Sequence, residues 1–364
     1  MDSITDKKKQ HYIPKFYLRN FSFKKNEKQI GLFHLKSKFY FQQAALKDQG
    51  SKKFFYGYDG KIENRLSQVE GFLSTIINDI IEHECVPKRG SVEHIDLLGF
   101  VALTDLRSPS KLKTMQTNLD VMTQSVLDLD PTAEVTKIVP TFNHDDAIKI
   151  SLSAIPEIID IMYDLEFKLL INTTSNPFIT SDLPVVRYNQ FLEQRKWPHG
   201  KTGYGNTGLQ IFIPLNPRLM LVFYDPSVYK LGFRKQMTSR ITKSADLDNL
   251  NILQFLNCIE TVFFDDKSSE HYIRTLYQAS SNFGLANQHR SKESYLIQDG
   301  DDRAKVLSEK TNLLIMGITD CEIRLQLDGL KMLSSTRGKK LHPTITQLRP
   351  WAADVIRRRS SRDD

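Results

Sequence analysis

Two glutamates on one predicted helix carry the first candidate chemistry. Glu63 and Glu70 follow the turn signal Asp59-Gly60, and apolar residues recur at helical spacing from Ile62 onward. Seven residues make nearly two helical turns, so both carboxylates point the same way. Such a pair could hold a divalent cation or share acid–base work. The alternative is a pair of surface glutamates that bind neighbouring lysines.

Arg107 supplies the complementary charge. It ends a second predicted helix, which Ser91 caps and Pro109 stops. If the two helices form an antiparallel hairpin, Arg107 lies near Glu63, at the start of the first helix. The planar guanidinium could then bind a phosphate or one of the glutamates, or it could cap the carbonyl groups at its own helix end.

The segment PFITSDLPVVRYN places another candidate between two strand-like runs. Thr180-Ser181-Asp182 interrupts the runs just before Pro184, which lacks an N–H donor and favours extended backbone in the residue before it. We expect a turn or bulge here, and bulges are common beside active sites. Asp182 could be a metal ligand or a base, or it could bind the backbone of its own turn.

His11 opens the segment HYIPKFYLRNF, which carries more aromatic surface than a segment exposed to water would tolerate. We therefore expect residues 11–21 to dock into the body of the protein. Docking could bring His11 to a site, where it would act as a base, a hydrogen-bond donor to a phosphate or a metal ligand. A lone histidine beside aromatic rings can also be structural, with its hydrogen bonds satisfied inside the core.

Several familiar motifs are missing. GKTGYGNTG ends like a phosphate-binding loop at Gly200-Lys201-Thr202, but the earlier glycine and the preceding strand are absent. The G-x-G-x-x-G that begins at Gly203 lacks the strand and helix of a dinucleotide site. There is no HExxH, no G-x-S-x-G and no zinc-type spacing of Cys and His. The polar loop over 191–208 is nevertheless long enough to be functional.

The elements that must position these residues predict an α+β fold. Residues 1–165 are mostly helical behind a small β entry, with further helices over 110–129 and 144–164, the last broken at Pro156. Residues 166–283 contain five short strand-like segments and then helices, which favours a mixed or antiparallel sheet with flanking helices. These two regions are expected to form one compact unit. Residues 284–364 are a C-terminal extension with a basic tail.

Composition narrows the class of protein. The 364 residues are 40% hydrophobic and 26% charged, an ordinary balance for a globular chain. No apolar run reaches the ~18 residues of a membrane span, and MDSITDKKKQ lacks the apolar run of a secretory signal. Three well-separated cysteines predict reduced thiols in the cytoplasm. A net charge of +7 and a pI near 9.0 suit a polyanionic partner, and solvated basic tails are the alternative explanation.

Five segments in order resemble the bacterial domain-of-unknown-function family 4238, from His11 to about Tyr277: HYIPKFYLRNF, FFYGYDGKIENRLSQVE, LTDLRSP, FITSDLPVV and IPLNPRLML. The most specific elements are H-Y-x-P-x-x-Y-L-x-x-F and T-S-D-x-P-V. The resemblance implies that the family's motif positions are occupied here by His11, Pro14, Tyr17, Leu18, Phe21, Glu63, Glu70, Arg107, Thr180, Ser181, Asp182, Pro184 and Asn251. The family has no established activity, so the resemblance supports a map of the site and not a reaction.

The favoured hypothesis is a metal-dependent phosphodiesterase or nuclease-like hydrolase, of the kind that acts as a bacterial toxin or anti-phage defence effector. Its candidate catalytic residues are His11, Glu63, Glu70, Arg107 and Asp182. The candidate ligands for Mg²⁺ or Mn²⁺ are Glu63, Glu70 and Asp182. The candidate ligand-binding residues are Lys15, Tyr17, Thr180, Ser181 and Asn251.

The expected partner of this hydrolase is nucleic acid or a nucleotide. We expect no association with a membrane. One alternative is a non-catalytic sensor module that binds a nucleotide or another ligand. The other is an interaction protein in which the charged cluster is a structural ion-pair network.

Overall fold

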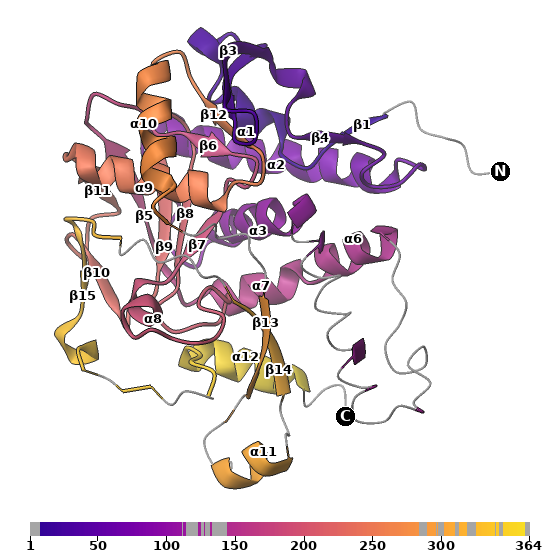
Figure 1. The fold of residues 1–364 in the computed structure, drawn as a ribbon, viewed down its shortest axis with the longest axis vertical. Coiled ribbons are helices and arrows are strands. Elements are labelled where there is room, and N and C mark those ends of the chain that lie inside the picture. The colour runs from indigo at the N-terminus through magenta and orange to yellow at the C-terminus, as the bar shows by residue number, and fades with distance from the viewer. Residues whose placement is uncertain are drawn as a thin grey trace.

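The computed structural model describes residues 8–110, 144–283 and, with short gaps, 290–360, together with isolated positions between 110 and 144. Helices cover both faces of a mixed main sheet, so the fold is α+β as predicted (Figure 1). None of the helices described is both long and apolar enough to cross a lipid bilayer.

The opening segment is docked, as its aromatic residues predict. β1 (Lys9–His11) pairs antiparallel with β4 (Ser51–Lys53), and α1 (Lys15–Arg19) follows. Tyr17 and Phe21 are completely buried in the main core. Burying a large apolar side chain contributes roughly 1.5–3 kcal/mol, which is enough to hold this segment against the body.

Two long helices follow the entry strands. α2 (Lys61–His83) and α3 (Val92–Leu106) pack against each other. The Ser91 side chain accepts a hydrogen bond from the His94 N–H at 3.3 Å, which confirms the predicted N-cap. The helix predicted over 110–129 falls mostly outside the described residues.

The helix predicted over 144–164 is two helices. α6 (His144–Ser153) and α7 (Ile155–Met162) are separated at Ala154, and Pro156 lies in the first turn of α7. A proline in a helix interior removes a hydrogen bond and clashes with the preceding turn, whereas the first turn has no such bond to lose. The predicted break is therefore confirmed.

In the part of the chain that the structure describes, the main sheet has the order β11-β5-β9-β8-β7. Its strands are β5 (Glu166–Asn172), β7 (Val186–Tyr188), β8 (Gln210–Pro214), β9 (Leu219–Tyr224) and β11 (Thr238–Ile241). β11 runs parallel to β5, and the other neighbours are antiparallel. The sheet is therefore mixed, one of the two forms predicted.

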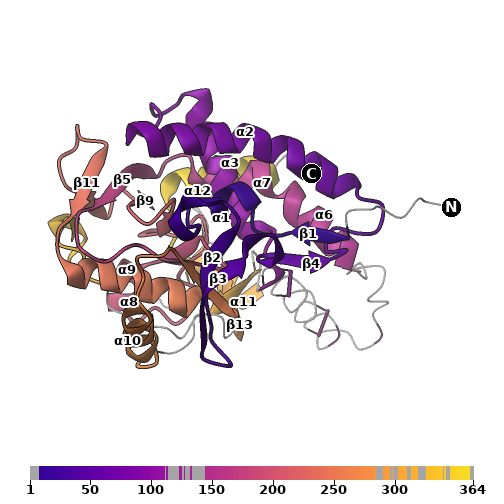
Figure 2. The same cartoon turned by 90° about the horizontal axis from the view of Figure 1, so that it is seen from above.

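Alternating side chains on the main sheet divide the core into two clusters. On β5, Leu169 belongs to the cluster that contains side chains of α2, α3 and α7, and Leu170 belongs to the cluster that contains side chains of α9 (Ser244–Asn257) and α10 (Glu270–Ser280). Figure 2 shows α2 and α3 on one side of the strands and α9 on the other. Because both faces are covered, β8 and β9 are buried along their whole length.

A second sheet joins distant parts of the chain in the order β3-β2-β12-β6. Its strands are β2 (Gln29–His34), β3 (Phe39–Ala45), β6 (Thr180–Ser181) and β12 (Thr261–Phe264). The sequence predicts that the strand-like run at Thr180 joins the same sheet as the runs that adjoin it in the chain. In the structure, Thr180 instead lies opposite Phe263 of β12, in the second sheet. A local pattern that repeats every two residues shows which side chains share a face of a strand. It does not specify which sheet that strand joins.

The remaining elements surround this body. They are the 3-10 turns Phe23–Lys25, Leu46–Asp48 and Ser334–Thr336, α8 (Gln190–Gln194) within the predicted polar loop, β10 (Tyr229–Leu231), β13 (Arg290–Tyr295), α11 (Arg303–Glu309), β14 (Leu313–Ile318), β15 (Leu330–Met332) and α12 (Pro350–Ser360). β15 pairs antiparallel with β10, and α12 packs on α7. The C-terminal segment therefore contacts the body through both a strand and a helix.

Candidate functional site

The end of α3 brings Arg107 to α2. Its Nη1 donates a hydrogen bond to Glu70 Oε1 at 2.6 Å, a charge-assisted contact between the two predicted helices. Arg107 is the C-cap residue of α3, as predicted from the sequence. Its side chain has no exposed surface, whereas Glu70 keeps 22% of its side-chain surface in contact with solvent. The pair thus lies at the boundary between core and water.

Two donors of this guanidinium meet no hydrogen-bond geometry with the part of the chain that the structure describes, although the Tyr56 side chain lies beside the group. Arg107 Nε and Nη2 are buried and make no hydrogen bond to any residue that the structure describes. An unsatisfied buried donor costs about 1–3 kcal/mol, and more when the group is charged. The guanidinium is a planar fork that can bind two oxygens of one anion. Its free donors therefore suit a phosphate or a carboxylate.

Tyr56 and Glu63 complete the surroundings of the guanidinium. Burial lowers the pKa of Arg107, but the nearby Tyr56, Glu70 and Glu63 raise it by more, so the charge is retained. Burial raises the pKa of Tyr56, and Arg107 lowers it in part. The protonated Tyr56 hydroxyl donates to the His11 carbonyl oxygen at 3.1 Å.

His11 lies at the end of β1, within electrostatic reach of Arg107. Its Nε2 is 3.2 Å from the Lys47 carbonyl oxygen, which assigns the N–H to Nε2 and leaves Nδ1 as an acceptor. Burial, and then the positive charges of the exposed Lys15 and of Arg107, lower the pKa of His11 from 6.5 to about 4. The imidazole is therefore neutral at pH 7. We refer to the following residues as the Arg107 cluster: His11, Tyr56, Glu63, Glu70 and Arg107.

Gln10 ties β1 to the loop that carries Tyr56. Its buried side chain donates to the Gly57 carbonyl oxygen at 3.0 Å and accepts from the Tyr56 N–H. These bonds position His11 and Tyr56 relative to each other. The sequence analysis singled out neither Gln10 nor Tyr56, although Tyr56 lies inside the motif FFYGYDG.

Asp105 anchors the same end of α3 to the main sheet. Arg187 Nε on β7 lies 3.2 Å from Asp105 Oδ2, and the Tyr204 hydroxyl donates to the same oxygen. The Arg187 guanidinium also stacks 4.5 Å from the centre of the Tyr204 ring. The end of α3 is therefore held to α2 through Arg107 and to β7 through Asp105. No sequence pattern pointed to this second network.

Asp182 does not have the predicted role. Its carboxylate accepts hydrogen bonds from the backbone N–H groups of Ile259, Glu260 and Thr261, at 2.8, 2.7 and 3.0 Å. Burial raises the pKa of Asp182, and these three bonds lower it in part. The carboxylate is occupied by the backbone between α9 and β12, so the geometry fits neither a metal ligand nor a free base. The alternative of a bond to its own turn is also wrong, because the partners lie on a distant segment.

Four of the predicted ligand-binding residues make internal hydrogen bonds instead. The Tyr17 hydroxyl contacts Thr180 Oγ1 at 2.7 Å and donates to the Pro214 carbonyl oxygen at 2.6 Å. Ser181 Oγ donates at 2.8 Å to Gln254 Oε1. These groups join α1, β6, β8 and α9, and they are buried.

Asn251 is the fourth of these residues and is also completely buried. Its Oδ1 accepts from the Ile179 N–H at 3.1 Å, and its Nδ2 donates to the Pro177 carbonyl oxygen at 2.9 Å. The residue therefore fastens α9 to the segment that leads directly into β6. Lys15 is exposed, and of the five predicted ligand-binding residues it alone lies beside the Arg107 cluster through its charge on His11.

The predicted metal set is not assembled. Among the described residues, no three His, Cys, Asp or Glu side chains are grouped so that they could hold a metal ion. Asp182 is occupied by the backbone, which leaves Glu63 and Glu70 from the predicted set. Arg107 contacts Glu70 directly, and His11 and Glu63 lie within electrostatic reach of Arg107, whereas Asp182 is occupied elsewhere. That these groups share one cleft stays a prediction.

A family model with the description "Protein of unknown function (DUF4238)" matches residues 9–268. No curated protein and no solved structure is significantly similar to the chain. The matched range contains the whole Arg107 cluster and both sheets that position it. It covers well over half of the 364 residues, so the chain belongs to the DUF4238 family.

Proposed function

We propose that this protein is an enzyme that hydrolyses phosphate esters, with the Arg107 cluster as its active site. The observation that carries the proposal is the buried guanidinium of Arg107, which keeps two N–H groups without a partner among the described residues. Preorganised donors of this kind stabilise the charge that develops on a phosphoryl group during transfer. A nuclease-like phosphodiesterase is the reaction class that combines this feature with the basic charge of the chain.

In the proposed reaction, Arg107 binds the non-bridging oxygens of the phosphate through Nε and Nη2. His11 is neutral and its Nδ1 can accept a proton from the attacking water. The water oxygen bonds to phosphorus as the ester P–O bond breaks, and the leaving oxygen takes a proton from solvent. The positive charge of Arg107 is one cause of the low pKa of His11, so a bound phosphate would offset that charge and raise the pKa toward neutrality. Substrate binding would thereby strengthen the base.

Mg²⁺ or Mn²⁺ remains part of the proposal only through Glu63 and Glu70, the two carboxylates of the predicted set that lie on α2. The expected partner is nucleic acid or a nucleotide. The setting that we propose is the cytoplasm of a bacterium, in the role of a toxin or an anti-phage effector. The few, dispersed cysteines support a cytoplasmic location, and the basic charge supports a nucleic-acid or nucleotide partner.

The test is an assay of purified protein on bis(p-nitrophenyl) phosphate, RNA, and single- and double-stranded DNA, each with Mg²⁺, Mn²⁺ or EDTA. We expect cleavage of at least one substrate. Arg107→Lys and His11→Gln should each lower kcat/KM by about 100-fold, because each removes a group that acts on the transition state. Loss of activity in EDTA, with recovery in Mg²⁺ or Mn²⁺, would support a metal at Glu63 and Glu70.

Arg65→Lys is the matched control, since Arg65 lies on the same helix as the two glutamates and is exposed. It should retain wild-type activity, and circular dichroism should show that all variants are folded. If folded wild-type protein cleaves none of these substrates, the hydrolase proposal is overturned. Thermal stabilisation by a nucleotide that yields no product and that Arg107→Lys abolishes would instead support the sensor module, with about 2.7 kcal/mol expected at a hundredfold excess over Kd.

One observation favours the structural alternative. The bond of 2.6 Å between Arg107 and Glu70 is a nearly buried ion pair of the kind that holds helices together without chemistry. In that case Arg107→Met would lower stability, because it leaves the partly buried Glu70 without its partner, but each folded molecule would bind or cleave no less than the wild type. A loss of activity in folded Arg107→Met would exclude this alternative.

A further inference from the structure

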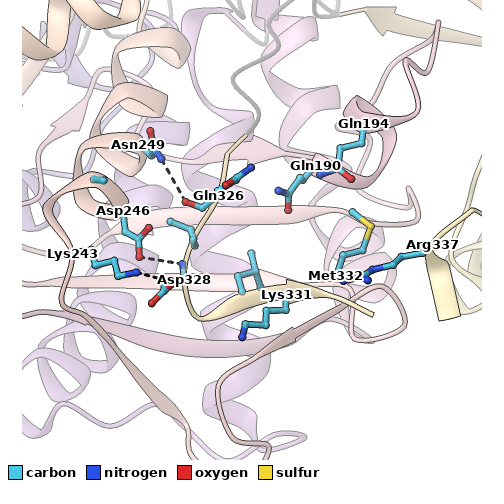
Figure 3. A pocket seen from close by; sticks show the side chains of 13 residues that line it. Gln190, Gln194, Lys243, Asp246, Asn249, Gln326, Asp328, Lys331, Met332 and Arg337 are labelled. Carbon is cyan, nitrogen blue, oxygen red and sulfur yellow. Dashed lines mark hydrogen bonds and ion pairs between the residues drawn. The ribbon is translucent and has the colours of Figure 1, made fainter. Parts of the chain in front are cut away.

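A pocket with polar side chains lies beside the core cluster that contains α9 and α10, between the family region and the segment that follows it. Its volume is about 670 Å³, which is in the range of small-molecule sites. Figure 3 shows Lys243, Asp246 and Asn249 of the α9 side facing α8 and Arg337 across the pocket. The residues that line it are Gln190, Gln194, Lys243, Ala245, Asp246, Asn249, Gln326, Leu327, Asp328, Leu330, Lys331, Met332 and Arg337.

The acidic side chains of this pocket already interact with other groups of the protein. Lys243 Nζ lies 3.1 Å from Asp328 Oδ1, and Asp246 Oδ2 accepts from the Asp328 N–H at 3.1 Å. Lys331 and Arg337, by contrast, make no ion pair with any residue that the structure describes. The pocket therefore keeps two exposed positive charges for a ligand.

The β10–β15 ladder concentrates positive charge at the same place. Lys331 lies directly opposite Lys230 in the antiparallel register. Like charges in this arrangement repel each other and destabilise the pair of strands. A bound anion would relieve the repulsion, so the ladder favours a negatively charged ligand beside Lys331.

Side-chain amides supply the other half of the recognition. Gln190, Gln194, Asn249 and Gln326 come from three separate segments, and an amide can both donate and accept. The buried Gln190 amide already donates to the Leu325 carbonyl oxygen, so Gln194, Asn249 and Gln326 supply the donors. Asn249 Nδ2 is only loosely bonded, at 3.5 Å from the Gln326 carbonyl oxygen. Leu327, Leu330 and Met332 provide apolar surface next to these amides. This combination suits a flat heterocycle with hydrogen-bonding edges.

We propose that this pocket binds a nucleotide, with its phosphate at Lys331 and Arg337 and its base among the amides. The site is separate from the Arg107 cluster, which packs in the other core cluster. Residues 326–337 lie beyond the matched range 9–268, so the pocket exists only because the C-terminal segment closes over α8 and α9. The nucleotide site is therefore a property of this chain and not of the family region alone.

The experiment is isothermal titration of the full-length protein with AMP, GMP, CMP, UMP and inorganic phosphate. We expect at least one nucleotide to bind more tightly than inorganic phosphate. Arg337→Gln should weaken binding by about tenfold, because a charged hydrogen bond to phosphate is lost. Asn249→Leu should weaken nucleotide binding and leave phosphate binding unchanged.

Lys88→Gln, an exposed lysine between α2 and α3 that lines none of this pocket, is the matched control and should bind like the wild type. Equal affinity for inorganic phosphate and all nucleotides would overturn the proposal, since the amides would then recognise nothing. Binding that Arg107→Lys abolishes and Arg337→Gln leaves intact would also overturn it, and would leave the proposed hydrolase standing. Retention in Arg107→Lys with loss in Arg337→Gln would establish the pocket.

Discussion

At the residue scale, the Arg107 cluster combines charge with burial. A guanidinium without exposed surface keeps its charge because Tyr56, Glu70 and Glu63 surround it. The same positive charge makes protonation of the neighbouring His11 unfavourable. Burial and Lys15 lower the pKa of His11 more than Arg107 does. The charge state of each group therefore depends on its surroundings, which is typical of functional sites and also of buried ion-pair networks.

His11 makes stability depend on pH. In the unfolded chain it takes up a proton near pH 6.5, but in the folded protein only near pH 4, so the unfolded state binds more protons between these values. The contribution of neutral His11 to the free energy of unfolding should therefore be fully present above about pH 6.5. It should be lost as the pH falls from 6.5 to about 4. Partial solvent screening leaves a contribution on the order of 1–2 kcal/mol.

Urea unfolding of the wild type and of His11→Gln at several pH values between 7 and 4 checks this expectation. The variant should lose part of the pH dependence. His94 is the comparison, because burial and then Arg89 lower its pKa to about 4 as well, and His94→Gln should show a similar partial loss. A pH dependence that His11→Gln leaves unchanged would contradict the low pKa of His11.

At the element scale, single polar side chains decide how neighbouring segments join. Asp182 follows β6 directly, and its three bonds hold the segment between α9 and β12 in place. The backbone of Asp182 adds a fourth contact, since its N–H donates to the Thr261 carbonyl oxygen at 2.9 Å. The T-S-D-x-P-V motif therefore joins two elements rather than presenting a catalytic carboxylate.

Asp182→Asn should destabilise the protein by about 2–4 kcal/mol, because an amide cannot accept all three N–H groups and loses the charge that strengthens them. Thermal and chemical unfolding measure the change. Asp59→Asn is the control, since exposed Asp59 accepts one N–H, from Lys61 at 3.0 Å, and should change stability by no more than about 0.5 kcal/mol. Equal effects of the two variants would show that the Asp182 contacts are not stabilising.

Glycine has opposite roles in two elements. A Cβ on Gly31 of β2 would lie 2.3 Å from Phe264 Cε2 and 2.8 Å from the Phe264 carbonyl oxygen, so Gly31→Ala should destabilise by about 1–3 kcal/mol. A Cβ on Gly71, inside α2, would meet nothing within 4 Å, so Gly71→Ala should stabilise by about 0.5–1 kcal/mol. The difference in melting temperature between the two variants checks both. Destabilisation by Gly71→Ala would show that this face of α2 is covered.

At the scale of the whole molecule, Arg349 fastens the C-terminal segment to the body. Its Nε lies 2.9 and 3.0 Å from the two carboxylate oxygens of Asp164. Nη1 donates to the carbonyl oxygens of Tyr204 and Asn206, and Nη2 donates to that of Ile161. One buried side chain thus connects α7, the loop around Tyr204 and the start of α12.

Arg349→Met should destabilise the protein by about 3–5 kcal/mol, because it breaks a buried pair and leaves Asp164 and several carbonyl groups unpaired. Limited proteolysis should then release the C-terminal segment before the body is cleaved. Arg357→Met is the control, because the ion pair of exposed Arg357 with Asp354, at 3.3 Å, should contribute no more than about 1 kcal/mol. Wild-type protease resistance in Arg349→Met would show that the segment is held by other contacts.

Local rules of the sequence determined much of the helical region. Ser91 as an N-cap, Arg107 as a C-cap and the break at Pro156 each depend on residues within one helical turn, so they could be predicted. The shared face of Glu63 and Glu70 follows from helix geometry in the same way. Short β-rich runs bounded by Pro, Asn, Gly and Asp likewise predicted β5, β7, β8 and β9 of the main sheet, but not β11.

Tertiary structure decided the rest. Only the fold brings 259–261 to Asp182, assigns β6 to the second sheet and surrounds Arg107 with Tyr56 and Glu70. The T-S-D-x-P-V pattern looks the same whether its carboxylate faces a ligand or a distant backbone. Hydrogen bonds and burial between remote segments make that difference, and a local pattern contains no information about them.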